Sequence, residues 1–336
     1  MKAAVLIKYN KNNLNLEIKE LPVPQIEGNE VLFKVMAAGV NPLDNMITRG
    51  EVKLIVPYKM PLVMGNELSG IIEKVGKNVT RFAVGDKVYG RMPLEKIGAF
   101  AEYAAIDKNA LARMPEYLSF EEGASVPLTA LTAQQALELM NPKEGETIFI
   151  SGGTGSLGAM AIPIAKAMGL TVITNGSGDN EERVRRLGAD QFIDYKKEDY
   201  ANVISKVDYV LDTLGDKELE KEFSVLKDGG ILVSLRGLPN GAFAKRAGLS
   251  KVKQFLFGLV GSKYDKMAAK KDQQYHFIFV HEDGRGLDRI NEIFDNTPLE
   301  TSIDTVYSLD EINEALNKVA SGKSKGKTII RIGQKD

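Results

Sequence analysis

The sequence predicts an α/β protein with two domains, one rich in short β-strands and one built on a doubly wound parallel sheet. The chain has 336 residues, and a single core usually stops growing at about 250–300 residues. Short strands and turns fill residues 1–123, whereas strands and helices alternate over residues 124–281. Such alternation is typical of a parallel sheet covered on both faces. We expect the last segment, residues 282–336, to return to the first domain.

The first domain is predicted from short apolar runs that alternate with turn signals. Gly28-Asn29, Gly76-Lys77-Asn78 and Gly85-Asp86 are typical of turns. We expect this domain to consist mainly of β-strands, with one short helix. The predicted strands are Ala3–Ile7, Glu30–Ala37, Leu68–Val75, Lys87–Tyr89 and Phe100–Ala105.

The second domain is predicted from a helical pattern over Phe120–Leu139, broken near Pro127, and from the alternation that follows it. Tyr209–Leu211 carries no charge, as expected for a strand in a sheet that is covered on both faces. Such sheets are usually parallel, so we expect these strands to be parallel. The predicted strands are Thr147–Ile150, Leu170–Thr174, Gln191–Tyr195, Val207–Asp212, Gly230–Leu235 and Tyr275–Val280, with helices over Ala159–Met168 and Glu181–Leu187. A helix over Leu309–Ala320, capped by Ser308, and a strand over Gly326–Ile332 close the chain.

A glycine-rich turn joins the first of these parallel strands to a helix, with the sequence Gly152-Gly153-Thr154-Gly155-Ser156-Leu157-Gly158. We expect Gly153 and Gly155 to permit a tight turn with positive φ, and Gly158 to let the helix press against the strand. Unpaired N–H groups at the positive end of the helix would then bind a diphosphate. The pattern therefore predicts a Rossmann-type dinucleotide site, and the alternative is a plain strand-to-helix turn.

The composition argues against several classes of site. The chain has 44 Lys and Arg residues against 45 Asp and Glu residues, which argues against a general nucleic-acid-binding surface. It has no cysteine, so disulfides, a thiol nucleophile and cysteine-ligated zinc are excluded. No run of 18 apolar residues occurs, and the apolar start is too short for a signal peptide. We expect a cytoplasmic protein without stable membrane insertion.

Several separated motifs resemble those of one family. They are Ala38-Gly39-Val40-Asn41-Pro42-Leu43-Asp44, Gly65-Asn66-Glu67-Leu68-Ser69-Gly70, Gly85-Asp86-Lys87-Val88-Tyr89-Gly90, Gly98-Ala99-Phe100-Ala101-Glu102-Tyr103, Leu131-Thr132-Ala133, Leu187-Gly188-Ala189-Asp190 and Gly326-Lys327. In order and spacing the chain resembles the medium-chain dehydrogenases/reductases, and within them the zinc-free quinone oxidoreductase and enone reductase branch. The resemblance implies a GroES-like catalytic domain formed by both ends of the chain, with the Rossmann domain inserted between them.

The resemblance also implies chemistry without a metal. Zinc-dependent relatives place Cys, His and Cys at positions that match Asn41, Asn66 and Leu128 of this chain. Leucine does not ligate a metal, and two neutral amides are poor zinc ligands. The histidines, His276 and His281, lie far along the chain, and we expect neither to bind a metal. We therefore expect hydride transfer without zinc.

The end of the second Rossmann strand bears on the choice between NAD and NADP. NAD-binding sites usually carry an acid there, and here the strand runs into Asn175-Gly176-Ser177. We expect NADPH, with Ser177 and Asn180 near the 2′-phosphate and added charge from Arg183 or Arg186, although Asp179 lies beside Asn180. Alternatively, Ser177 and Asn180 only cap the following helix.

The resemblance assigns roles to residues of both domains. It implies that Asn41 and Asp44 lie near the reacting carbon and that Thr132 contacts the nicotinamide. The other cofactor contacts that it implies are Thr154, Gly155, Ser156 and Leu157 at the diphosphate, Tyr195 near the adenosine, and Arg236 and Lys327. Tyr58 is a candidate proton donor because it lies on the loop before Gly65, and its alternative role is packing. Asp212 is expected to be mostly structural.

Together these features predict an NADPH-dependent, metal-independent reductase of quinones or α,β-unsaturated carbonyl compounds, and the resemblance implies a homodimer. The alternatives are a 2-enoyl thioester reductase and a non-catalytic NADPH-binding protein. A basic segment over residues 240–274 is longer than the corresponding segment of compact family members. It is compatible with a lid, a dimer contact, a membrane-surface helix or a solvated amphipathic helix.

Overall fold

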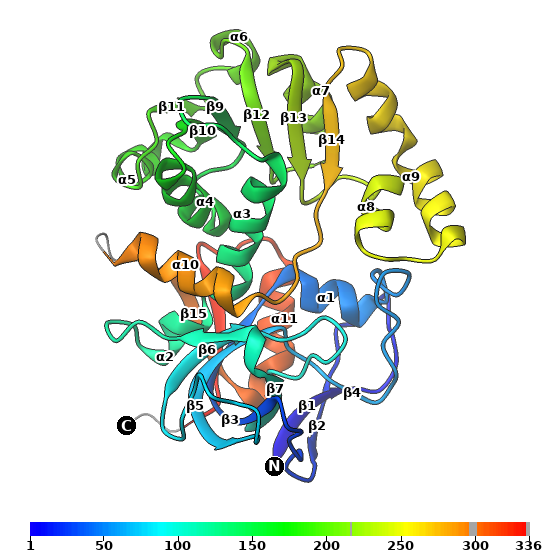
Figure 1. Cartoon of the computed structure of the whole chain (residues 1–336), viewed down its shortest axis with the longest axis vertical. Helices are drawn as coiled ribbons and strands as arrows, with labels where there is room; N and C mark the ends of the chain where they lie inside the picture. The colour runs from blue at the N-terminus through cyan, green and yellow to red at the C-terminus, as the bar shows by residue number, and fades with distance from the viewer. Residues whose placement is uncertain (216, 296–300, 334–336) are drawn as a thin grey trace. The chain divides into compact units, whose positions relative to one another are not determined.

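The computed structural model describes residues 1–215, 217–295 and 301–333 (Figure 1). The chain divides into two compact units, Met1–Leu131 with His281–Asp336, and Thr132–Val280. The second unit is thus inserted between two parts of the first. The units divide at 131/132 and 280/281, whereas the sequence analysis places the domain boundaries at 123/124 and 281/282.

Strands dominate the first unit. They are β1 (Lys2–Leu6), β2 (Glu17–Glu20), β3 (Glu30–Val40), β4 (Leu62–Val63), β5 (Glu67–Val75), β6 (Lys87–Arg91), β7 (Tyr103–Asp107), β8 (Leu111–Arg113), β15 (Ile303–Ser308) and β16 (Lys327–Arg331). A seven-stranded sheet has the order β15-β16-β3-β5-β6-β8, and its seventh strand, β7, pairs with β3. A smaller sheet has the order β2-β1-β4.

The C-terminal strand joins the N-terminal part of the first unit, as the sequence predicts. β16 runs antiparallel to β3, with Thr328 opposite Val40. β3 runs antiparallel to β5, with Gly39 opposite Glu67. These two registers bring the start of β16, the end of β3 and the start of β5 to the same end of the sheet.

The helices of the first unit are short. They are α1 (Pro42–Arg49), α2 (Phe120–Ala124), α10 (Gly284–Phe294) and α11 (Ile312–Ala320), with 3₁₀ turns η1 (Lys108–Ala110) and η3 (Leu309–Glu311). A further helix, α3 (Pro127–Met140), runs from the first unit into the second. The predicted interruption near Pro127 is confirmed, because α2 ends at Ala124 and α3 begins at Pro127. Ser308 begins the last helical segment as predicted, and its backbone N–H and hydroxyl both donate to Glu311.

The second unit has the predicted doubly wound parallel sheet. Its strands are β9 (Thr147–Ile150), β10 (Thr171–Gly176), β11 (Gln191–Asp194), β12 (Val207–Asp212), β13 (Leu226–Ser234) and β14 (Gln274–Phe277). They are parallel in the order β11-β10-β9-β12-β13-β14. The chain therefore winds outward from β9 in one direction and then in the other. Ile148, Phe149 and Ile150 of the central strand are fully buried.

Helices connect these strands. They are α4 (Ser156–Ala167), α5 (Glu181–Arg186), α6 (Tyr200–Val203), α7 (Lys217–Val225), α8 (Gly241–Arg246) and α9 (Lys251–Ala269), with the 3₁₀ turn η2 (Gly178–Asn180). The basic segment forms α8 and α9, which lie beside β14 at the edge of the sheet (Figure 1). Within the part of the chain that the structure describes, no helix combines the length and apolar character needed to cross a bilayer.

Candidate active site

Three strand ends of the first unit bring polar side chains together. β3 ends just before Asn41, β5 begins at Glu67 and β16 begins at Lys327. The side chains of all three residues are buried, with 3%, 0% and 7% of their surface exposed. Since buried polar groups are costly without partners, this cluster must supply its own hydrogen bonds.

Asp44 lies in the first turn of α1, fully buried, and accepts two hydrogen bonds. The backbone N–H of Asn41 donates to Oδ2 at 2.7 Å, as part of a capping box, and Asn66 Nδ2 donates to Oδ1 at 2.8 Å. Burial raises the pKa of Asp44 to about 7, aided by the charge of Glu67, and the two hydrogen bonds and Lys327 oppose this rise. The carboxyl group is therefore partly protonated at neutral pH.

The ammonium group of Lys327 is surrounded by three oxygen atoms. It donates to Asn41 Oδ1 at 2.6 Å and to Thr129 Oγ1 at 2.9 Å, and it lies 2.7 Å from Glu67 Oε1. Lys327 was predicted to approach the cofactor. The structure adds that it is bonded to Asn41, another predicted site residue.

Glu67 was not predicted as a site residue, yet its carboxylate is the centre of this cluster. Besides Lys327, Asn41 Nδ2 donates to Oε1 at 2.8 Å, and the backbone N–H of Leu128 donates to Oε2 at 2.7 Å. Gly39 leaves room for the carboxylate, since a Cβ there would lie 2.3 Å from Oε1. The available signal was an acid at the start of β5, followed by the uncharged residues Leu68–Ile72.

Arg91, at the end of β6, is a second buried charge that the sequence pattern did not indicate. Its Nη1 donates to the carbonyl of Met92 at 2.5 Å and lies 3.8 Å from Glu282 Oε2. Its Nε and Nη2 have no hydrogen-bond partner among the residues that the structure describes. Burial lowers the pKa of Arg91 to about 10, while Glu282 and Tyr58 act in the opposite direction.

Tyr58 is half-buried, and its hydroxyl donates to the carbonyl of Leu94 at 2.7 Å. Burial raises the pKa of Tyr58, and the charge of Arg91 opposes this rise. The phenolic proton therefore has a carbonyl acceptor already. A role for Tyr58 as proton donor stays a prediction.

The glycine turn of the second unit joins β9 to α4 as predicted, but positive φ occurs at a different glycine. Gly152 has φ of 69°, whereas Gly155 has φ of −81° and Gly153 is not in the positive region. The expectation of positive φ at Gly153 and Gly155 was therefore wrong. Gly153 is required for space, since a Cβ there would lie 2.0 Å from Thr174 Oγ1. A Cβ at Gly158 would lie 2.2 Å from the carbonyl of Gly153, so the helix presses on the turn rather than on the strand.

The N-terminus of α4 is suited to an anion. Its N-cap residue is Gly155, so no side chain caps the helix. Gly155 and Ser156 are exposed, while Thr154 and Leu157 are half-buried. The first N–H groups of a helix lack partners within the helix, and the macrodipole is positive at this end. An anionic group placed here would therefore be stabilised.

The end of β10 holds the turn in place. Asn175 Oδ1 accepts from the backbone N–H of Gly152 at 2.8 Å, and the Asn175 carbonyl accepts from that of Gly153 at 3.1 Å. The Thr174 hydroxyl donates to the carbonyl of Ile150 at 2.6 Å. Neither residue was predicted as part of the site. The signal was a polar pair at the end of a buried strand.

Ser177 and Asn180 follow β10 at the N-cap positions of η2 and α5, although neither side chain makes a capping hydrogen bond. Their positions therefore agree with the alternative interpretation as helix caps, and their side-chain bonding does not. The Ser177 hydroxyl donates to Asp179 Oδ2 at 3.0 Å, and Lys196 Nζ lies 3.7 Å from the same oxygen. Tyr195 is 60% exposed just after β11.

The ends of β12 and β13 are tied together by Asp212, which is fully buried. Its Oδ1 accepts from the backbone N–H groups of Leu214 and Gly215 at 2.8 and 2.7 Å, and the Ser234 hydroxyl donates to its Oδ2. These bonds support the structural role expected for Asp212. The backbone N–H of Arg236 also donates to Ser234 Oγ, at 3.2 Å. Thr132, the predicted nicotinamide contact, is buried in α3.

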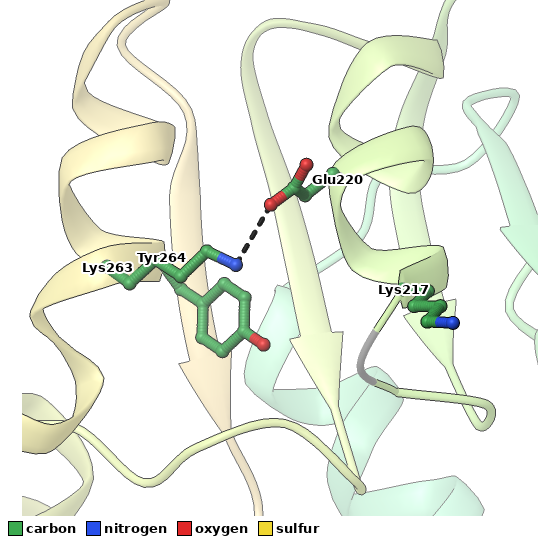
Figure 2. A pocket seen from close by; sticks show the side chains of 4 residues that line it. All are labelled: Lys217, Glu220, Lys263 and Tyr264. Carbon is green, nitrogen blue, oxygen red and sulfur yellow. Dashed lines mark ion pairs between the residues drawn. The ribbon is translucent and has the colours of Figure 1, made fainter.

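A cavity of about 330 Å³ in the second unit is lined by Lys217 and Glu220 of α7 and by Lys263 and Tyr264 of α9. Figure 2 shows Lys263 and Glu220 extending toward each other from the two helices, and their charged atoms are 2.9 Å apart. None of the predicted site residues lines this cavity. We therefore do not assign it to the cofactor.

The residues at the zinc-ligand positions do not fit a zinc ion. Asn41 uses its side-chain oxygen to bind Lys327 and its nitrogen to bind Glu67. Leu128 donates its backbone N–H to Glu67, and its apolar side chain has no atom that ligates a metal. A zinc ion here would meet two neutral amides, a leucine and an ammonium group, rather than thiolate and imidazole ligands. Across residues 1–215, 217–295 and 301–333, no three His, Cys, Asp or Glu side chains are grouped to hold a metal.

Comparison with known proteins agrees with this architecture. Residues 27–116 match the alcohol dehydrogenase GroES-like domain, and residues 187–330 match the family described as zinc-binding dehydrogenase. The mitochondrial NAD(P)H oxidoreductase RTN4IP1 of Danio rerio is 31% identical, over 99% of this chain and 91% of that protein. The 2-methylene-furan-3-one reductase of Solanum lycopersicum is 30% identical, over 94% of this chain and 75% of that protein.

A solved structure is similar along its whole length. The quinone oxidoreductase of Coxiella burnetii has a TM-score of 0.82 and 27% identity, and 99% of each chain is covered. The match that carries the zinc-binding description covers residues 187–330, and Asn41, Asn66 and Leu128, which the family resemblance aligns with zinc ligands, lie outside it. The chain thus belongs to the medium-chain dehydrogenase/reductase family, in its quinone and enone oxidoreductase branch, and is an oxidoreductase.

Proposed function

We propose that the chain transfers hydride from NADPH to quinones or α,β-unsaturated carbonyl compounds without a metal. The observation that carries this proposal is the N-terminus of α4, which no side chain caps and which follows a glycine turn. Such an end suits the diphosphate of a dinucleotide. The names of the relatives add support, since one is an NAD(P)H oxidoreductase, one reduces a 2-methylene-furan-3-one and one is a quinone oxidoreductase.

In this proposal the cofactor is bound mainly by the second unit. Its diphosphate is bound by Thr154, Gly155, Ser156 and Leu157, while Gly153 and Gly158 keep the turn compact. Thr132 contacts the nicotinamide, and Tyr195 and Arg236 contact other parts of the cofactor. The exposure of Gly155 and Ser156 supports this arrangement.

The preference for NADPH rests on the residues after β10 and β11. The carboxylate of Asp179 is bonded to Ser177 and lies near Lys196. A 2′-phosphate carries the same sign of charge and more acceptor oxygens, so it would replace Asp179 as the partner of Ser177 and Lys196. Asn180, Arg183 and Arg186 are further candidates. The preference predicts a higher kcat/KM with NADPH than with NADH.

At the reacting end, NADPH supplies a hydride, which an enone takes at its β-carbon before a proton completes the reduction at the α-carbon. We assign Asn41 and Asp44 to this end. Asp44 holds the backbone N–H of Asn41, and it thereby fixes the start of α1 from which the Asn41 side chain projects. Catalysis would come chiefly from orientation. Tyr58 or water supplies the proton.

The test follows NADPH absorbance with 1,4-benzoquinone, a cyclic enone and a crotonyl thioester as separate acceptors, with and without a zinc chelator. We expect turnover with the quinone or the enone, unchanged by the chelator. Equal kcat/KM values with NADH and NADPH would contradict the cofactor preference. The variant Gly153→Val is the control, because its side chain would overlap Thr174 and disrupt the turn.

The remaining outcomes separate the alternatives. Turnover of the thioester alone would favour a 2-enoyl thioester reductase, with the lysines of residues 240–274 near a coenzyme A phosphate. Tight NADPH binding without turnover of any acceptor would favour a non-catalytic binding protein. We also propose a homodimer, which sedimentation tests directly. A cytoplasmic location stays a prediction, and the relative from Danio rerio is named as mitochondrial.

A further inference from the structure

We propose that Lys327 is a built-in cation, fixed in a cage of three oxygen atoms, which provides the positive charge of this site in place of a metal. The cage consists of Asn41 Oδ1, Glu67 Oε1 and Thr129 Oγ1, at 2.6, 2.7 and 2.9 Å from Nζ. The proposal concerns charge and hydrogen bonding inside the first unit. It does not depend on which acceptor the enzyme reduces.

The N–H donors of the Lys327 ammonium group match the surrounding oxygen acceptors in number. An ammonium group has three N–H donors and no acceptor, and here each N–H has one oxygen within hydrogen-bonding distance. Binding a cofactor phosphate directly would require breaking one of these bonds. We therefore infer that Lys327 positions Asn41 and Glu67 and is not itself a phosphate ligand.

The charge balance explains why a cation is needed at this position. Glu67 is fully buried, and a buried carboxylate without a cation is strongly unfavourable. Its second oxygen is already taken by the backbone N–H of Leu128, and the carboxyl group of Asp44, also fully buried, lies near enough to interact electrostatically with Glu67. The zinc-ligand positions hold two amides and a leucine. The cation beside Glu67 is therefore Lys327, at the start of β16.

A double-mutant cycle tests the pairing. Lys327→Met keeps the length of the side chain and removes the charge, so Glu67 is left buried without its partner. We expect the melting temperature to fall by about 5–10 °C. Adding Glu67→Gln should recover most of this loss, because the second change removes the unpaired charge. Lys325→Met, at an exposed lysine just before the same strand, is the matched control and should leave the melting temperature unchanged.

A second readout separates a caged cation from a phosphate ligand. We expect NADPH to bind the Lys327→Met, Glu67→Gln protein within about threefold of the native affinity, a difference of less than 1 kcal/mol. The proposal would be overturned if the losses in melting temperature of Lys327→Met and Glu67→Gln simply added in the double variant. It would also be overturned if NADPH binding were weakened more than tenfold in both proteins that lack Lys327. If Lys327→Met is insoluble, recovery of folded protein by Glu67→Gln supports the proposal and failure to recover it counts against it. The melting temperatures test the pairing of Lys327 with Glu67 even if the native protein reduces none of the acceptors.

Discussion

Asn41 and Asp44 lie three positions apart, and the sequence predicted both as site residues. Their mutual hydrogen bond is local, since it belongs to the first turn of α1. Their other partners are distant along the chain. Asn66 lies 22 positions from Asp44, and Lys327 lies 286 positions from Asn41. No local pattern specifies such partners. They follow from the registers of three strands, which only the folded sheet determines.

The motifs were easier to recognise from their residue types than the local conformation of each residue within them. The glycine-rich pattern correctly indicates a turn before α4, but it does not say which glycine takes positive φ. Gly152 takes it, because Asn175 holds its backbone N–H where β10 ends. In the same way Ser177 has the right residue type for a helix cap, yet its hydroxyl bonds to Asp179 instead. Both outcomes depend on neighbouring groups rather than on intrinsic preference.

The buried Asp44 should make stability depend on pH. The pKa of this carboxyl is about 7 in the folded protein, against about 3.9 in an unfolded chain. Between these values the folded protein holds a proton that the unfolded chain has released. The contribution of Asp44 to stability is therefore fully present below about pH 4 and falls by about 1.4 kcal/mol for each pH unit up to about pH 7. Above this range it no longer changes.

Asp44→Asn removes this titration and provides the comparison. Unfolding by urea at pH 5, 6, 7 and 8 should show the variant gaining stability relative to the native protein from pH 5 to pH 7, with only a small further gain at pH 8. The variant can keep both contacts if the Asn66 amide rotates, since Asn66 Oδ1 has no partner among the described residues. A constant difference across the four pH values would show that Asp44 does not titrate in this range.

At the scale of elements, the strands with apolar character were predicted and the polar or very short ones were not. Thr147–Ile150 and Val207–Asp212 are strands at the predicted residues. β2, with the sequence Glu-Ile-Lys-Glu, was missed, because its pairing with β1 rather than its own pattern makes it a strand. The predicted strand Phe100–Ala105 is displaced to Tyr103–Asp107, since the Phe100 carbonyl bonds to Ala4 of β1.

The glycine turn allows a matched pair of variants that separate folding from cofactor binding. A Cβ at Gly153 would lie 2.0 Å from Thr174 Oγ1, whereas a Cβ at Gly155 would meet only the Gly152 carbonyl, at 3.4 Å. Gly153→Ala should therefore lower the melting temperature by several degrees, about 1–3 kcal/mol in stability. Gly155→Ala should leave the melting temperature nearly unchanged, because its φ of −81° suits alanine.

NADPH affinity should respond differently in the same pair. If the diphosphate approaches the backbone at Gly155, a methyl group there obstructs it, so Gly155→Ala should weaken NADPH binding about tenfold while the protein stays folded. Calorimetry or fluorescence titration measures this directly. Native affinity in Gly155→Ala would mean that the cofactor does not lie over this turn.

At the scale of the whole molecule, one unit is inserted into another, as the family resemblance implied. The change in pattern near residue 124 and the closing strand pointed the same way, and β16 does pair with β3. The role of the basic segment could not be predicted in the same way. In α9, Val252, Phe255 and Leu259 are 70%, 67% and 60% exposed, while Phe257 is buried. Such an exposed apolar row favours a covered helix, as in a lid, dimer contact or membrane-surface helix, over a solvated one.

The charge balance at the same scale agrees with the proposal that the protein works without zinc. The buried Glu67 has its cation in Lys327, and the proposed site for the cofactor diphosphate is the N-terminus of α4. In this proposal, hydride passes directly between the nicotinamide and the acceptor. Metal-free transfer is therefore the claim on which the proposed function depends.

Isotope transfer tests this claim most directly. The chelator-treated enzyme would be given an enone and NADPH carrying deuterium at C4, with each of the two C4 positions labelled in separate samples. Mass spectrometry and NMR of the product locate the label. We predict one deuterium at the β-carbon of the reduced enone from one of the two cofactors. An unlabelled product from both, or label transfer that appears only when zinc is added back, would contradict metal-free hydride transfer.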